Sequence, residues 1–313
     1  MTSQTQPRLH VTDETLLAFA AEVGDSGPVA VEGGRTRWAA GGEPTPDVRL
    51  VTAPTGIVDY VPDEMTVTVR AGTSVADLHA ALAEQGQRTA LPERGGTVGG
   101  ALAVGENSVH VLGRGRVRTA ALQVRYVSDD GRLVTGGGPT VKNVTGFDLP
   151  RLMVGSLGTL GLIAEVILRT NPIPAITRWV GSADVDPFAV LDTVLRPGAV
   201  LWNGATTWIE LEGHGAAVDA EQQRLAEIGT FIEAAGPPPL PKHRWSLEPA
   251  AMRSTEQFGD GSWVASVGVG TVWCDQPQPQ RQPDLGVQAL GDRIREQFDP
   301  RGRLNPGRTP GSN

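Results

Sequence analysis

Three glycine-rich loops lie in the first half of this chain, and they constrain its fold more than any other feature. They span Glu32–Thr36, Gly95–Ala101 and Gly155–Gly161. The chain holds 40 glycines and 24 prolines among its 313 residues, about a fifth of the total against a usual ~12%, and no collagen-like period accompanies them. Such a chain must contain many tight turns and places where two backbone segments approach closely.

Charge and cysteine content exclude several classes of protein. Lys+Arg 27 against Asp+Glu 35 gives a net charge of −8, whereas a general nucleic-acid binder carries a basic face. The single cysteine, Cys274, excludes an internal disulfide, a cysteine-based zinc site and an iron–sulfur cluster held by this chain. The apolar stretch Leu152–Leu168 is short of ~20 residues and contains Glu165, so we do not expect a membrane span.

Periodicity and capping residues predict mixed helices and strands up to about residue 170. Asp13–Val23 has the spacing of an amphipathic helix, which Gly24 ends. Ser74 and Asp148 can each cap a further helix, and Asp130-Gly131 marks the loop of a hairpin. Strands are expected at 28–31, 48–52, 65–69, 121–127, 132–135 and 162–168.

The segment Asn171–Pro174 predicts a boundary, because its two prolines deny the chain regular structure. Beyond it, the expected order is strand, helix, strand, strand, helix, strand, which is the ferredoxin-like arrangement. These elements are expected at 177–180, 187–195, 199–202, 207–211, 216–235 and 263–273, with a last helix at 285–298.

Glycine loops of this kind suit a diphosphate. Backbone N–H donors must converge on such a ligand, and a side chain at Cβ would keep the backbone away. A helix that begins directly after the loop, as at Thr97–Gly100, adds a favourable dipole. We therefore expect Gly34 and Gly99 to combine close approach to a phosphate with a positive φ. For each loop alone, an ordinary tight turn is the alternative interpretation.

Two common nucleotide motifs are absent. Gly268-Val269-Gly270 lacks the final glycine of the Rossmann fingerprint, and the glycines of the third loop recur at the wrong spacing. Neither Lys142 nor Lys242 follows a glycine loop in the manner of a P-loop. A bound dinucleotide must therefore be held by another fold.

Five stretches occur in the order found in one known family. They are Val29–Gly34, Ala71–Ser74, Gly96–Gly100 with Arg114–Arg118, Val141–Leu149 and Gly155–Ile163. On these residues the chain resembles the FAD-binding fold of the vanillyl-alcohol oxidase and p-cresol methylhydroxylase (PCMH) type. Lys142–Met153 and Phe298–Arg308 look most like the corresponding segments in FAD-binding subunits of bacterial glycolate oxidases.

This resemblance implies an α+β fold, namely a two-lobed PCMH-type FAD-binding domain with a small ferredoxin-like α+β cap. It implies an FAD-binding domain over residues 1–174 and a cap or substrate domain over 175–295. It also implies that the C-terminal segment 296–313 returns to the FAD-binding domain.

The resemblance further implies which residues contact FAD. One side of the diphosphate would be lined by Glu32, Gly33, Gly34, Arg35, Thr36 and Arg37. The other side would be lined by Thr97, Val98, Gly99, Gly100, Ala101 and Gly105. The adenine or ribose end would be met by Gly158, Gly161, Ile163 and Asn305. For Asn305, which precedes Pro306, the start of a turn is the other interpretation.

Departures from the family pattern shape the remaining expectations. Members with covalent flavin carry a histidine where this chain has Arg35, so we expect non-covalent FAD. Relatives that oxidise 2-hydroxyacids use clustered histidines, often with a metal, and an arginine for the carboxylate. Here no two of the five histidines have metal-ligand spacing, so no metal is expected. They stand at His10, His79, His110, His214 and His243.

The candidates for catalysis are His243 and Arg244, which adjoin Trp245. An exposed loop after the proline run at 237–241 is the other interpretation of this segment. Arginine suits the carboxylate of an acid because its planar fork can donate two parallel hydrogen bonds.

Two functions from different classes follow. The first is an FAD-dependent oxidoreductase subunit that oxidises a small 2-hydroxyacid of the glycolate or D-lactate type by hydride transfer to flavin N5. The alternative is a non-catalytic FAD-carrying subunit for electron transfer or assembly; a stand-alone oxidase of a sugar or alditol fits the small cap less well. The expected partners are a larger FAD subunit and an iron–sulfur subunit. The expected location is cytoplasmic, at the inner face of the membrane only through those partners.

Overall fold

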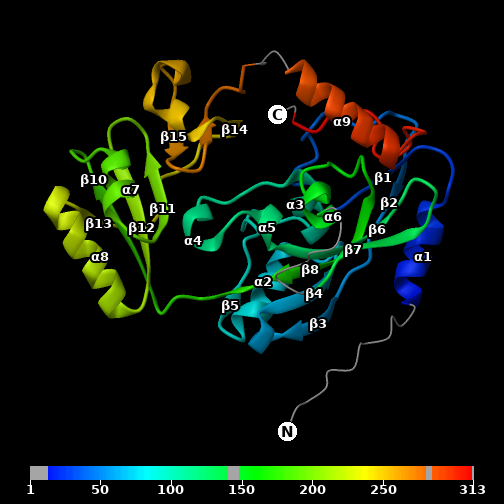
Figure 1. The fold of residues 1–313 in the computed structure, drawn as a ribbon, viewed down its shortest axis with the longest axis horizontal. Coiled ribbons are helices and arrows are strands. Elements are labelled where there is room, and N and C mark those ends of the chain that lie inside the picture. The colour runs from blue at the N-terminus through cyan, green and yellow to red at the C-terminus, as the bar shows by residue number, and fades with distance from the viewer. Residues whose placement is uncertain (1–12, 140–147, 280–283, 312–313) are drawn as a thin grey trace, which may run out of the picture.

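A computed structural model describes residues 13–139, 148–279 and 284–311. Its ribbon forms two parts joined side by side, with α4 (Val111–Arg114) between them (Figure 1). The N-terminal part is built on a five-stranded antiparallel sheet of order β3-β4-β8-β6-β7. Its strands are β3 (Ile57–Val61), β4 (Thr66–Arg70), β6 (Ala121–Val127), β7 (Leu133–Gly137) and β8 (Leu162–Arg169).

Strand β8 is the centre of this sheet, and all of its residues except the last are buried. Helices pack around the sheet and share one apolar core with it. They are α1 (Glu14–Val23), α2 (Val75–Ala83), α3 (Val98–Val104), α5 (Val117–Ala120) and α6 (Leu149–Met153). Smaller elements of this part are η1 (Pro62–Glu64) and the paired strands β5 (Gln87–Arg88) and β9 (Asn171–Pro172).

The predicted caps Ser74 and Asp148 are confirmed, because their side chains each accept a hydrogen bond from a backbone N–H in the first turn of α2 and α6. Asp13, expected as the first residue of a helix, caps α1 in the same way. Gly24 ends α1 with φ 63°, a left-handed conformation that glycine adopts without strain. The hairpin loop at Asp130-Gly131 joins β6 to β7.

A short parallel pair lies beside this sheet. Strand β1 (Val29–Val31) pairs with β2 (Arg49–Val51), and Leu304 near the C-terminus extends the pairing at Val29. The helix α9 (Leu285–Phe298) leads into this C-terminal segment. Residues far apart in the sequence therefore meet at the end of β1, where the first glycine loop begins.

The second part contains the predicted ferredoxin-like unit. Its first four strands lie in the order β13-β10-β12-β11, and all their pairings are antiparallel. The elements in chain order are β10 (Ile176–Ser182), α7 (Pro187–Thr193), β11 (Pro197–Trp202), β12 (Thr207–Gly213), α8 (Gly215–Ile228) and β13 (Ile232–Ala234).

Three predicted elements in this part were wrong. The helix expected at 216–235 ends at Ile228, and β13 follows it. The single strand expected at 263–273 is a hairpin, because Gly268 and Gly270 have positive φ values and reverse the chain. The segment at 243–246 is a strand and not a loop. The elements are β14 (His243–Ser246), β15 (Trp263–Ser266) and β16 (Thr271–Cys274), with η2 (Pro249–Arg253) and η3 (Glu256–Phe258) between them.

These three strands extend the ferredoxin-like unit to a seven-stranded sheet of order β13-β10-β12-β11-β15-β16-β14; we call residues 176–274, which contain this sheet and its helices, the cap. None of the helices in the described ranges is long and apolar enough to cross a membrane.

Candidate functional site

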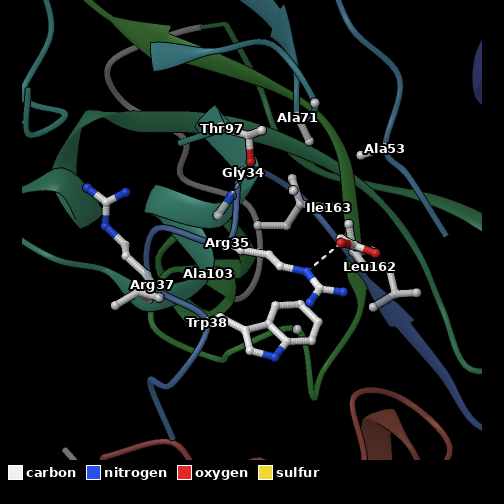
Figure 2. A pocket seen from close by; sticks show the side chains of 18 of the residues that line it. Gly34, Arg35, Arg37, Trp38, Ala53, Ala71, Thr97, Ala103, Leu162 and Ile163 are labelled. Carbon is white, nitrogen blue, oxygen red and sulfur yellow. Dashed lines mark hydrogen bonds and ion pairs between the residues drawn. The ribbon is translucent and has the colours of Figure 1, made fainter. Parts of the chain in front are cut away.

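A cavity of about 390 Å³ opens where the three glycine loops meet the C-terminal segment. Figure 2 shows it with Arg35 reaching across its interior and Ala53, Ala71, Leu162 and Ile163 on its wall. Its lining comes from the end of β1, the loop after it, the start of α3, the start of β8 and the C-terminal segment. The ends of several elements thus form one pocket from residues that the sequence keeps far apart.

Most of the predicted cofactor residues line this cavity. They are Glu32, Gly33, Gly34, Arg35, Thr36, Arg37, Thr97, Gly99, Gly100, Gly158, Ile163 and Asn305. Four others do not line it. Val98 and Ala101 are fully buried in the core. Gly105 ends α3 against Gly155, and Gly161 packs on the ring of Tyr126.

The expected positive φ at Gly34 and Gly99 was wrong. Neither residue is among the glycines with positive φ. Both are glycine because the backbone is crowded: a Cβ on Gly34 would lie 3.0 Å from Cα of Gly96, and one on Gly99 would lie 2.8 Å from Cβ of Ala71. These two glycines allow the loops to pack on the rest of the protein. In the first two glycine loops, the residues with a positive φ are Gly95, Gly96 and Arg35.

The first loop carries a run of available donors. Within the described part of the chain, the backbone N–H groups of residues 33–37 donate to no protein acceptor. The N–H groups in the first turn of α3 differ, because those of Val98 and Gly99 donate to the carbonyls of Thr73 and Ala71, and that of Gly100 donates to Thr97 Oγ1. Consecutive free N–H groups around a left-handed residue form an anion-binding concavity. The first loop is therefore suited to hold an anion.

Arg37 links the first two glycine loops. Its Nε donates to Glu106 Oε2 at 2.6 Å, and its Nη1 donates to the carbonyl of Gly95 at 2.9 Å. Glu106 also accepts from Arg94 Nη1 at 2.8 Å. Nη2 of Arg37 is buried without a partner among the described residues, so this guanidinium has one donor left for a ligand.

Glu106 is a buried carboxylate held between two cations. Burial alone would raise its pKa, but the hydrogen bonds and charge of Arg37, and then of Arg94, outweigh burial and hold the pKa below its ordinary value. Sequence reasoning missed Glu106 and Arg94. The signal was present, because Glu106 directly follows Gly105, but an isolated acid in a loop indicates nothing by itself.

Trp38 is a second element that sequence reasoning missed. Its ring lies between two guanidinium groups, with Arg35 at 4.8 Å and Arg308 at 4.7 Å from the ring centre. Arg308 also donates from Nη1 to the carbonyls of Trp38, Ala40 and Gly42. This stack joins the first loop to the C-terminal segment at the cavity wall.

Arg244 lies on β14 of the cap and faces the N-terminal part. The charged groups that act on it are Glu106, Arg116 and Arg94. Its Nε is buried without a hydrogen-bond partner in the described ranges, and no ion pair reaches it there. Burial lowers its pKa, Glu106 opposes this, and Arg116 and Arg94 add to it. Burying part of an arginine without a counter-ion is costly unless an anion joins it.

The structure does not bring His243 and Arg244 together. They are consecutive on β14, and successive side chains of a strand point to opposite faces. Trp245, which shares the His243 face, packs into an apolar cluster of the cap. His243 therefore does not share the position of Arg244 beside Glu106.

A further polar cluster joins the two parts elsewhere. His110 Nδ1 contacts Glu210 Oε2 at 2.6 Å, and Arg88 donates to both oxygens of Glu212 at 2.8 and 2.5 Å. The ligand atoms of His110, Glu210 and Glu212 lie within 4.8 Å of one another and could hold a metal ion by geometry. Because both carboxylates already have partners, we interpret the cluster as polar contacts that tie the cap to the N-terminal part. It lies four strands away from β14, roughly 19 Å.

Two features that the sequence singles out, His10 and the family-like segment 141–147, lie outside the described residues.

The cavity fits a dinucleotide on two grounds. It lies within the 300–1,000 Å³ range of ligand sites. It presents free backbone donors beside an arginine, and Arg37 holds an unpartnered donor at its edge. No histidine, cysteine or tyrosine occurs among its described lining residues.

Comparison with known proteins agrees with this geometry. Residues 12–137 match the family described as FAD binding domain. The chain is 32% identical over 214 residues to glycolate oxidase subunit GlcE of Escherichia coli, covering 65% of this chain and 61% of that protein. It is 33% identical over 162 residues to a D-lactate dehydrogenase of Archaeoglobus fulgidus, covering 50% and 36%.

The chain thus spans about three fifths of the length of the first of these relatives and about a third of the second. Among solved structures, an alkyldihydroxyacetonephosphate synthase superposes with a TM-score of 0.69 at 15% identity, covering 96% of this chain and 75% of that one. This likeness shows the PCMH-type fold, and the α+β architecture with its small cap is as predicted.

Proposed function

We propose that the chain is an FAD-dependent oxidoreductase subunit that oxidises a small 2-hydroxyacid of the glycolate or D-lactate type. The observation that carries the proposal is the pairing of two features. One is a cavity with five consecutive free N–H donors in an FAD-binding domain. The other is Arg244 of the cap. It has no ion-pair partner in the described ranges, and the charge of Glu106, which binds Arg37 of the first loop, acts on it. The names of the two relatives support the substrate class.

The first glycine loop would hold the diphosphate of FAD through the N–H groups of residues 33–37. Gly158, Ile163 and Asn305 would meet the nucleoside end, because they line the part of the cavity that the start of β8 and the C-terminal segment form. We propose that FAD is held without a covalent bond, since the described lining offers no histidine, cysteine or tyrosine side chain for attachment. Bound flavin would supply a hydride acceptor.

Arg244 would bind the carboxylate of the acid. Arg37 and Arg94 bond to Glu106, and the charges of Arg94 and Arg116 act on Arg244, so positive charge exceeds negative charge among these residues. A carboxylate would neutralise part of that excess and accept hydrogen bonds from Arg244. Glu106 would keep Arg37 and Arg94 in place and thereby leave Arg244 available.

The alternative function is an FAD-carrying subunit for electron transfer or assembly. One observation favours it: within the described ranges no histidine lines the cavity, and none is among the charged groups that act on Arg244. A hydroxyl proton then has no histidine acceptor among these described residues. In either case electrons must leave through a diffusible acceptor or another protein.

We propose that the partners of this chain are a larger FAD subunit and an iron–sulfur subunit. Cys274 is its only cysteine, so a cluster would have to be held by another protein. GlcE is named as a subunit, which supports an assembly of several chains. We also retain as proposals the division into 1–174, 175–295 and 296–313, and a cytoplasmic location that reaches the membrane only through partners.

The test is anaerobic reduction of the FAD-loaded chain. Glycolate or D-lactate should bleach the flavin absorbance of the chain alone or of its co-expressed assembly. Bleaching by neither acid in either form would contradict the oxidase proposal, and bleaching in the assembly alone would favour the alternative. Acid precipitation should release all flavin, and yellow colour retained on the pellet would contradict non-covalent binding.

A further inference from the structure

A second cavity, of about 470 Å³, lies on the N-terminal part of the molecule. It shares none of its described lining residues with the cavity in Figure 2, and its volume falls within the 300–1,000 Å³ range of ligand sites. Its apolar lining comes from Val75, Ala76 and Ala83 of α2 and from Ile173. The second cavity is therefore a separate space with a partly apolar surface.

Two polar residues of the second cavity are engaged by the protein. Arg88 donates to both oxygens of Glu212 at 2.8 and 2.5 Å, and only its buried Nε lacks a partner in the described ranges. Gln87 donates from Nε2 to the carbonyl of Pro62 at 2.8 Å, and its Oε1 accepts from two neighbouring hydroxyl groups. These two side chains support the fold and are not available to a ligand.

Arg114, at the end of α4, is different. Its side chain is 10% exposed, and its Nη1 donates to Glu93 Oε1 at 3.0 Å. Its Nε is buried without a partner, and its Nη2 donates to no residue in the described ranges. The side chain of Glu93 is 67% exposed. Because one contact from an exposed acid is a weak tie, another carboxylate can replace Glu93 on Arg114 at little cost.

His79 supplies a second free donor. Its Nε2 lies 3.0 Å from Thr89 Oγ1, and that oxygen also accepts from the N–H of Leu91. Thr89 is fully buried, so its hydroxyl hydrogen needs an acceptor, and Nε2 is the acceptor that the described residues offer. The proton of the neutral ring therefore sits on Nδ1, which contacts no other described residue.

The ring of His79 is neutral at pH 7. Burial lowers its pKa, the charge of Glu93 opposes this, and the charge of Arg114 adds to it. These charges act on the ring because the three side chains line one cavity. Nδ1 of His79 and Nη2 of Arg114 are therefore two unpartnered N–H donors beside the same space.

We propose that the second cavity binds a small carboxylate with an apolar body. The carboxylate takes the place of Glu93 on Arg114 and accepts a hydrogen bond from Nδ1 of His79, while the apolar body lies against α2. A carboxylate suits this pair because it accepts from several donors at once. The inference goes beyond the proposed oxidation and does not depend on bound FAD or on Arg244.

The test is calorimetric titration of the full chain with hexanoate, acetate and hexanamide. Hexanoate should bind at least about tenfold more tightly than acetate, because its chain contacts the apolar lining. It should also bind at least about tenfold more tightly than hexanamide, which lacks the charge. Saturation with FAD should leave hexanoate binding unchanged. Loss of hexanoate binding on addition of FAD would place the acid in the cofactor cavity and overturn the proposal.

Variants of the two donors should weaken hexanoate binding. We expect at least about a tenfold loss in Arg114→Met and about a threefold loss in His79→Phe. Arg118→Met is the matched control, because Arg118 is exposed and lines neither cavity. It should bind hexanoate as wild type does, and so should Arg244→Met. Wild-type affinity in Arg114→Met, or its loss in Arg244→Met, would overturn the assignment.

Glu93→Gln gives the sharpest outcome, because it removes the carboxylate that competes with the ligand. It should bind hexanoate more tightly than wild type, whereas Glu84→Gln, an exposed change outside both cavities, should not. Glu93 is exposed, so this variant also decides the question where Arg114→Met fails to fold. Unchanged or weaker binding in Glu93→Gln would overturn the proposal, and it would leave the cofactor site and the role of Arg244 untouched.

Discussion

The C-terminal segment holds a buried arginine and the cap holds a half-buried one, and the two arginines have opposite surroundings. Arg303 is 4% exposed, and its guanidinium donates to five backbone carbonyls. Arg244 has a buried Nε with no partner in the described part of the chain. Both guanidinium groups have a pKa lowered by burial, so burial alone does not distinguish them.

The difference shows how to separate structure from function in this molecule. The carbonyls around Arg303 belong to residues 23–27 and 129, and the contact fixes the C-terminal segment against the N-terminal part. No such contact satisfies the Nε of Arg244 within the described ranges, and other arginines surround it. A cation whose N–H donors all bond to the protein stabilises the fold, whereas a cation with free N–H donors is available to bind a ligand.

The largest expected effect is on stability. Arg303→Met should lower the free energy of unfolding by about 3 kcal/mol or more, because five carbonyls lose their donor at once. Arg244→Met should leave the free energy of unfolding within about 1 kcal/mol of wild type or raise it, because a half-buried charge without an ion pair in the described ranges is removed. Urea unfolding checks both. Equal destabilisation by the two variants would remove the distinction between them.

A smaller and pH-dependent effect is expected at Glu106. Its pKa lies below the ordinary value of 4.5, so its ionised form stabilises the fold above about pH 4.5, and this contribution is lost as pH falls through the lowered pKa. Glu106→Gln should therefore reduce the free energy of unfolding at pH 7 by about 1–3 kcal/mol.

The difference between Glu106→Gln and wild type should shrink as the pH is lowered toward 3. Urea titrations at the two pH values measure it. A difference that is the same at both would mean that the charge of Glu106 does not hold Arg37 and Arg94.

The smallest effect is expected at Cys274 on β16. Burial, and then the charge of Asp275, raise the pKa of its thiol to about 11, and its side chain is 1% exposed. At pH 8 a thiol reagent should not react with the native chain and should react at once after unfolding. Rapid reaction in the native state would show that this part of the cap sheet opens. Water would then reach β16 and the neighbouring strand β14, which carries Arg244.

The sequence predicted the features that depend on neighbours along the chain. Ser74 and Asp148 cap helices because an N-cap needs only the next three residues, and the glycine loops follow from local composition. The φ values were not predictable in this way. Gly34 packs closely on Gly96, and Gly99 packs closely on Ala71. Glycine is therefore required there by crowding from distant residues and not by its own backbone conformation.

The features that were missed depend on contacts between distant residues. Arg37 and Glu106 stand 69 residues apart, and neither has a motif around it. Strand β14 carries only four residues, and it is a strand because β16 pairs with it. The N–H groups at 33–37 are free and those in the first turn of α3 are not, and this difference depends on which carbonyls lie nearby. A sequence pattern does not show it.

The most direct test of the central distinction is the binding of oxalate to the FAD-loaded chain, followed by the change in flavin absorbance. We predict a saturable change in wild type. Arg244→Met should keep wild-type FAD affinity and lose oxalate affinity at least about tenfold. Undiminished oxalate binding by Arg244→Met, or no response of the wild-type flavin to oxalate, would contradict the account.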